Sequence, residues 1–155
     1  MKYFVYLLAS IIFIALDQFS KFYIVQSIKY GTKIQIIRNF FSLTNVRNFG
    51  AGFSILQNQR TFLIFVPIVA VFVLTYLLVT EKNKRKITSI SYILIIAGAI
   101  GNLIDRVRLG YVIDFLDFII FGYDFPVFNL ADTFITIGCF LLIIDNLLGS
   151  KDAKN

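Results

Sequence analysis

The chain has 155 residues, of which 58% are hydrophobic and only 15% are charged, with a formal net charge of +6. This apolar share is far above that of a soluble domain and indicates a membrane protein with a single domain over 1–155. The chain has no histidine and a lone Cys139, which excludes serine–histidine, cysteine–histidine and zinc chemistry and any disulfide framework. The positive charge suits anionic lipid headgroups, whereas nucleic acid is a poor fit because most basic residues lie in short segments between apolar runs.

The first apolar run predicts a membrane-spanning helix over about 3–25. Its first part could also be a signal peptide, but three further apolar runs follow, which favours a retained helix. Asp17 and Lys21 interrupt its outer third, four residues apart and therefore on one helix face. We interpret them as an ion pair that neutralises itself inside the membrane, and a catalytic Asp17 is the alternative.

Residues 26–60 differ in character, because they contain five basic residues and no acid. Alternating residues at 33–36 and 41–44 predict short strands that form a small hairpin or curved sheet at the membrane surface. Residues 48–54 then place Gly50 and Gly52 among aromatic side chains. Glycine allows close backbone approach or positive φ, so this stretch is either an ordinary turn or a mobile wall of a site.

Three more apolar runs predict spans over about 61–80, 87–106 and 130–148, with an outer loop or short outer helix over about 107–129. Four spans place both termini on the same side of the membrane. Basic residues are equally numerous on the two sides, but the dense basic loop at 81–86 favours cytoplasmic termini. The expected fold is an all-α membrane protein of four transmembrane helices with a small outward-facing β-sheet.

Five of the nine acidic residues lie between the third and fourth spans or at their ends: Asp105, Asp114, Asp117, Asp124 and Asp132. Carboxylates in such a position are costly and therefore suggest function. Bulky apolar neighbours surround Asp114 and Asp117, and they would raise the pKa of a carboxyl group by desolvation.

Two of these acids also have simple structural interpretations. Asp105 could form an ion pair with Arg106 or Arg108. Asp132 could face the helix dipole from the first turn of a helix capped by Asn129. The dipole would favour the ionised form of Asp132 while the apolar setting favours protonated Asp114, and two such acids divide into base and acid.

Five motifs, in this order along essentially the whole chain, resemble the motif set of the lipoprotein signal peptidase (signal peptidase II) family: Asp17–Lys21, Asn48–Ser54, Gly101–Arg106, Gly110–Phe115 and Phe128–Asp132. One such motif would be weak, but five in sequence are specific. The motifs contain no departure from the family pattern, although tryptophan, which is frequent in the outer segments of relatives, is absent.

The resemblance implies a bacterial inner-membrane aspartic protease with four transmembrane helices, an outward-facing β-cradle and an active site near the outer surface. It implies that the substrate is a diacylglyceryl-modified prolipoprotein, cut just before the lipidated cysteine, and that Asp114 and Asp132 form the catalytic dyad. It further implies a set of substrate-binding or supporting residues: Asn48, Gly50, Asn102, Asp105, Arg106, Asn129, and the pair Asp17 and Lys21. We expect a monomer that contacts membrane lipids and needs no cofactor or metal.

Two other classes of function remain open at this point. A small non-catalytic membrane protein, such as an assembly partner or transporter subunit, would use its acids only for helix pairing, and each carboxylate would be replaceable. A lipid-modifying transferase would also meet acylated substrates, but its usual histidine or cysteine is missing from the acidic stretch.

Overall fold

Four long helices form the body of the molecule. The computed structural model describes residues 1–51, 55–57, 59–81 and 85–152, with 149–152 described by their backbone only. Within these residues, the helices are long and apolar enough to cross a membrane: α1 Lys2–Ser27, α2 Arg60–Thr80, α3 Lys86–Arg108 and α4 Leu130–Asp152. The prediction of four spanning helices is confirmed.

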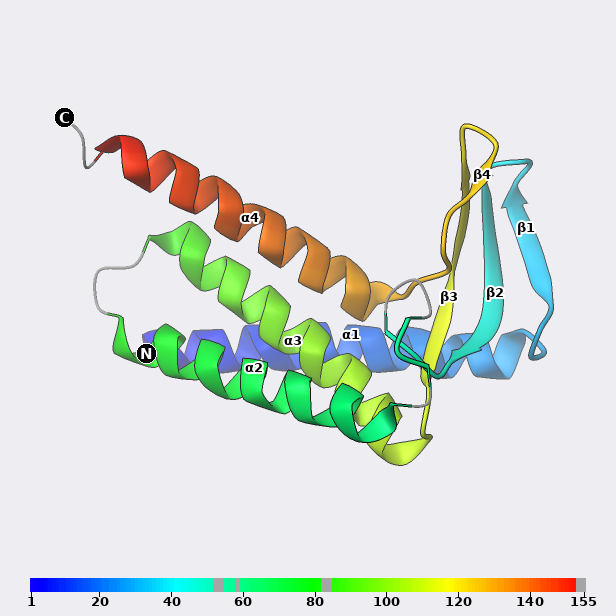
Figure 1. Ribbon diagram of the computed structural model, residues 1–155, viewed down its shortest axis with the longest axis horizontal. Coiled ribbons are helices and arrows are strands. Elements are labelled where there is room, and N and C mark those ends of the chain that lie inside the picture. The colour runs from blue at the N-terminus through cyan, green and yellow to red at the C-terminus, as the bar shows by residue number, and fades with distance from the viewer. Residues whose placement is uncertain (52–54, 58, 82–84, 153–155) are drawn as a thin grey trace.

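A four-stranded antiparallel sheet stands across one end of the helices, while both termini lie at the other end (Figure 1). The strands follow each other in the order β1 Lys33–Ile37, β2 Phe41–Asn48, β3 Val112–Ile120 and β4 Tyr123–Asp124. The predicted hairpin within 26–60 is therefore confirmed as β1 and β2.

The segment 107–129 differs from the expected loop or short helix, because it contributes β3 and β4 to the same sheet. β3 is rich in β-branched and aromatic residues, which favour strands. It pairs with the second edge of β2, where Val46 lies opposite Asp114, and so covers an edge that would otherwise be unpaired.

Helix α3 is the centre of the bundle and packs against α1, α2 and α4. It is mostly buried, whereas the other three helices expose large apolar side chains around the bundle, as helices in contact with lipid do. Its contact with α4 is backbone to backbone. A Cβ atom on Gly98 would collide with the carbonyl oxygen of Ala131, and one on Gly138 would lie 2.9 Å from the carbonyl oxygen of Ser91.

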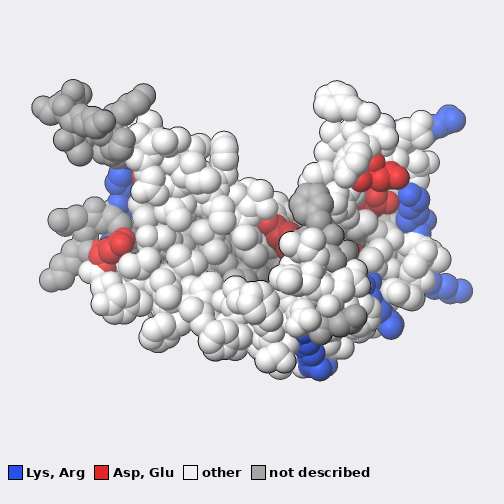
Figure 2. All heavy atoms as spheres, in the orientation of Figure 1, with Lys and Arg blue, Asp and Glu red and all other residues white. Residues whose placement is uncertain are grey.

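The helical body and the upper part of the sheet enclose a hollow, and acidic side chains are visible at its base (Figure 2). A second charged group lies at the opposite end of the bundle. There the buried carboxylate of Asp145 accepts a hydrogen bond from Thr88 and pairs with Arg85, with 3.2 Å between Nε and Oδ1. These contacts join α3 to α4 far from the sheet.

Candidate active site

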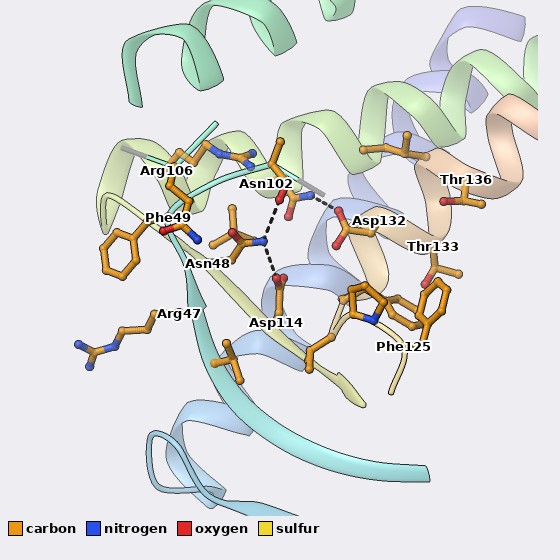
Figure 3. Close-up of a pocket in the computed structure, with 18 of the residues that line it drawn as sticks. Arg47, Asn48, Phe49, Asn102, Arg106, Asp114, Phe125, Asp132, Thr133 and Thr136 are labelled. Atoms are coloured by element: carbon orange, nitrogen blue, oxygen red, sulfur yellow. Dashed lines mark hydrogen bonds between the residues drawn. The ribbon is translucent and has the colours of Figure 1, made fainter. Parts of the chain in front are cut away.

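Two carboxylates, Asp114 and Asp132, line one pocket of about 640 Å³ at the junction of helices and sheet. Asp114 lies in β3 and Asp132 in the first turn of α4, so two elements that meet at this junction bring them together. The remaining walls are the end of β2, the end of α3 and residues 125–128. In Figure 3, side chains from all these elements converge around the two acids.

Asp114 is buried, with 2% of its surface exposed. Its Oδ2 accepts a hydrogen bond of 2.9 Å from Asn48 Nδ2 (Figure 3). Its Oδ1 accepts one of 2.7 Å from Asn129 Nδ2. Burial raises the pKa of Asp114 to about 7, and the negative charge of Asp132 adds to this. The two hydrogen bonds and the charge of Lys21 oppose the shift but do not cancel it. The predicted elevation is therefore found at Asp114.

Asp132 is held by the helix that carries it. Its Oδ2 accepts from the backbone N–H of Asn129 at 3.2 Å, and Asn129 Oδ1 accepts from the backbone N–H of Asp132 at 3.0 Å. This reciprocal pair is a capping box at the start of α4. The sequence predicted the cap at Asn129 and the place of Asp132 in the first turn, but not the bond from Asp132 back to Asn129. Asn102 Nδ2 donates to the other oxygen of Asp132 at 2.7 Å. Asp132 can therefore both cap α4 and belong to a functional site, because its carboxylate also faces the pocket.

A buried charge cluster supports the pocket from behind. Lys21 Nζ lies 2.9 Å from Asp17 Oδ2 and 3.0 Å from Asp105 Oδ2, and Gln18 bridges the two acids. Asp17 Oδ1 accepts from the backbone N–H of Ala131 at 3.0 Å and so ties α1 to the start of α4. The predicted Asp17–Lys21 ion pair is present. Asp17 does not line the pocket.

The expected pairing of Asp105 with Arg106 or Arg108 is wrong, because Asp105 pairs with Lys21. Successive helix residues point about 100° apart, so Asp105 faces α1 while its neighbour Arg106 faces the pocket. Asp105 Oδ2 also accepts from the backbone N–H of Ile113 at 3.2 Å, which fixes the start of β3.

Arg106 reaches across the pocket wall to the turn that follows β2. Its Nη2 donates to the carbonyl oxygen of Gly50 at 2.9 Å, and Asn48 Oδ1 accepts from the backbone N–H of Gly50 at 2.8 Å. Asn48 and Arg106 thus hold this turn from two sides. The predicted mobile wall extends to residues 52–54, which lie outside the described residues, so it stays a prediction.

Asp117 does not join the site, although it lies only three residues from Asp114. Side chains three apart in a strand point to opposite faces, and Asp117 pairs instead with exposed Lys33 at 3.4 Å. Arg47 also points away from the carboxylates in Figure 3, and its guanidinium lies 4.5 Å from the ring centre of Tyr30. Among the described residues, no three histidine, cysteine or acidic side chains are grouped to hold a metal ion.

Some pocket residues were not predicted from the sequence. Phe125 and Phe128 form one wall, and Thr133 and Thr136 line the side of α4 that faces it. The run of aromatic residues in 118–128 was the available signal, but only the folding of this segment onto β3 places it at the pocket.

Comparisons with known proteins agree with this geometry. The model of a family described as Signal peptidase (SPase) II matches residues 9–148. A lipoprotein signal peptidase of Staphylococcus aureus (strain bovine RF122 / ET3-1) is 38% identical over 156 residues, covering 99% of this chain and 94% of the relative. Another lipoprotein signal peptidase of Staphylococcus aureus is 36% identical over 156 residues, covering 99% of this chain and 96% of the relative.

Two solved structures described as bacterial membrane enzymes share the fold. One has a TM-score of 0.89 and 37% identity, and it covers 97% of this chain and 92% of that chain. The other has a TM-score of 0.83 and 38% identity, and it covers 92% of both chains. The chain therefore belongs to the signal peptidase II family, the aspartic lipoprotein signal peptidases of bacterial membranes, which process prolipoproteins.

Proposed function

We propose that Asp114 and Asp132 are the catalytic dyad of this peptidase, which hydrolyses the peptide bond just before the diacylglyceryl-modified cysteine of a prolipoprotein. One observation carries the assignment. The two carboxylates face the same pocket and are joined through Asn129, whose side chain donates to Asp114 and whose backbone donates to Asp132. The charge of Asp132 raises the pKa of Asp114, so the two acids are coupled, and an aspartic protease uses such a pair to share one proton.

The different surroundings of the two acids assign their roles. Asp132 lies at the positive end of α4, whereas Asp114 lies in a strand, so Asp132 is the ionised base that takes a proton from the attacking water. Asp114 keeps its proton up to about pH 7 and donates it to the oxygen of the scissile carbonyl. A neutral tetrahedral diol results.

The diol then collapses with the roles reversed. Asp132 gives the water-derived proton to the amide nitrogen, Asp114 takes a proton back from one hydroxyl, and the carbon–nitrogen bond breaks. The products are the carboxyl end of the signal peptide and the free amine of the lipidated cysteine. The dyad is restored to its starting protonation.

The supporting residues hold this geometry. Asn48 and Asn102 each donate to one of the acids, and Asn129 contacts both. Arg106 lines the pocket and is fixed by Gly50, and we assign it to orienting the substrate backbone. Asp17, Lys21 and Asp105 support the pocket from the bundle interior.

The same proposal includes the orientation in the membrane. Both termini and the basic loop at 81–86 face the cytoplasm, by the positive-inside bias, and the sheet with its pocket lies at the outer surface. The hollow in Figure 2 opens beside α4, where an acylated substrate can reach the carboxylates from the lipid. We expect the enzyme to act as a monomer.

Cleavage of a synthetic diacylated prolipoprotein peptide by the purified chain in detergent tests the proposal. Mass spectrometry should find a single cut on the amino side of the lipidated cysteine, and the unlipidated peptide should be a poor substrate. Cleavage at another bond would refute the assigned specificity.

A further inference from the structure

The ammonium group of Lys21 is enclosed by three acceptors. Besides Asp17 Oδ2 and Asp105 Oδ2, Lys21 Nζ donates to Asn102 Oδ1 at 3.0 Å. An ammonium group has three N–H bonds, and each has one acceptor here. Lys21 is 1% exposed, so water does not compete for these bonds. The charge and the position of the group are both fixed.

The orientation of the Asn102 amide follows from this contact. Because an ammonium group can only donate, the carbonyl oxygen of Asn102 must face Lys21. Its NH₂ group then faces the other way, and it donates to Asp132 Oδ1 at 2.7 Å. Asn129 Nδ2 adds a second donor to the Asn102 oxygen at 3.1 Å, which reinforces the same orientation.

We propose that Lys21 is a positioning residue of the peptidase, which acts through Asn102 to keep Asp132 the ionised member of the dyad. The inference rests on the proposed dyad. A hydrogen bond donated to a carboxylate favours its charged form. If the amide were reversed, its oxygen would face Asp132, and the carboxyl group would have to carry a proton to make the contact. The direction of one amide thus selects the protonation state of the base.

Net charge alone would not give this result. Lys21, Asp17 and Asp105 together carry one net negative charge, which would disfavour a further negative charge at Asp132. The other charged groups that face Asp132 are Asp114 from β3 and Arg106 from α3, which line the same pocket. The arrangement of the cluster is what favours ionised Asp132, because the member that contacts Asn102 is the Lys21 ammonium group rather than the carboxylate of Asp17 or Asp105.

The double variant Lys21→Met/Asp105→Asn tests the relay. It removes one cation and one anion, so the cluster keeps its net charge, but the Asn102 oxygen loses the ammonium group and keeps only the 3.1 Å bond from Asn129. The acid limb of the pH profile of kcat reports protonation of the base. We expect this limb to move to higher pH by about one unit, an approximately tenfold loss at acidic pH, with little change in KM. The single variant Asp105→Asn shows how far the acid limb moves when only the carboxylate of Asp105 is lost.

Arg85→Met/Asp145→Asn is the matched control. It removes the ion pair that joins α3 to α4 at the opposite end of the bundle, and should lower thermal stability without moving the acid limb. The proposed role of Lys21 would be refuted if the acid limb stayed in place in Lys21→Met/Asp105→Asn, or if it moved equally in the control.

Asn102→Asp provides a second test that does not depend on the folding of the double variant. Lys21 keeps three acceptors, so the cluster remains satisfied, but the side chain can no longer donate to Asp132. The new carboxylate also adds a negative charge beside Asp132, so the acid limb should move to higher pH by more than in the double variant, and an unchanged limb overturns the proposal. If the dyad assignment itself were wrong, the result would be different, because Asp114→Asn or Asp132→Asn would then retain activity.

Discussion

Asn129 and Asp132 exchange hydrogen bonds in both directions across the first turn of α4. The residue that begins the helix therefore also fixes the carboxylate that we assign as the base. The same Asn129 side chain donates to Asp114, so one amide aligns both acids with the end of a helix. The stability of the helix start and the geometry of the dyad depend on the same contacts.

Replacing either acid of the dyad by its amide should abolish cleavage. We expect Asp114→Asn and Asp132→Asn each to lose about three decades or more of kcat, because members of a catalytic unit fail together. Asp117→Asn is the matched control, since it lies on the same strand but faces the other side. Cleavage assays in detergent with thermal unfolding separate lost chemistry from lost folding. More than a tenth of parental activity in either variant would remove that acid from the dyad.

Activity should decline as pH rises through about 7, because Asp114 must be protonated to donate and burial raises its pKa to about 7. Asn48→Ala removes a donor that favours the ionised carboxylate, so the alkaline limb should move to still higher pH. Asn45→Ala, on the same strand but bonded to Ile28, should leave the limb unchanged. The pH profile of kcat in each variant measures this, and an alkaline limb that does not move in Asn48→Ala would contradict the prediction.

The raised pKa of Asp114 also has a consequence for stability. The unfolded chain ionises this carboxyl group near its ordinary pKa of 3.8, whereas the folded chain retains the proton up to about 7. Its contribution to stability is therefore complete below 3.8 and is lost as pH rises to about 7.

Substitutions at Asn129 should separate capping from catalysis. Asn129→Ser keeps an oxygen to cap α4, so its stability should stay within about 1 kcal/mol of the parent. It loses the donor that holds the Asp114 carboxyl group in place, and kcat should fall by about two decades, as expected for a misplaced catalytic group. Asn129→Ala should lose the same activity and about 1 kcal/mol more of stability. Equal unfolding temperatures for the two variants would contradict the capping role.

Gly98→Ala should force α3 and α4 apart, because the added methyl group collides with the backbone of Ala131. We expect a stability loss of about 1–3 kcal/mol, typical of overpacking, and reduced turnover since Asp132 moves with α4. Gly31→Ala is the control, where nothing lies within 4 Å of the new methyl group and only its positive φ causes strain. Unfolding temperature and kcat should both show the contrast, and equal losses would argue against a tight helix contact.

Chelators should leave the activity unchanged. Zinc sites favour histidine and cysteine, which the acidic stretch lacks, although carboxylates could still bind a hard cation such as Mg²⁺. Cleavage should therefore proceed equally with and without EDTA. Inactivation by EDTA that a divalent ion reverses would replace the dyad mechanism by a metal-dependent one.

Local patterns in the sequence were enough for some of these features. Asn129 and Asp132 are three residues apart, and a capping box needs no information from the rest of the chain. The apolar runs likewise define four helices, since membrane thickness fixes their length.

Contacts between distant segments could not be read in the same way. The partner of Asp105 is Lys21, 84 positions away, and only the rotation of α3 against α1 selects it over the adjacent arginine. Asp114 and Asp117 looked equivalent in a loop, but pairing of β3 with β2 sends them to opposite faces. In both cases the spacing of residues in the sequence allows two arrangements, and tertiary packing selects one of them.

The site draws its polar groups from α1, β2, α3, β3 and α4, which together extend over nearly the whole chain. Lys21 is made early in synthesis, whereas Asp132 follows only with the last span. If Asp114 and Asp132 are the dyad, as we propose, a nascent chain has no complete dyad until its fourth helix is made. On the proposed assignment, a protease that acts on membrane-bound peptides is inactive throughout its own insertion.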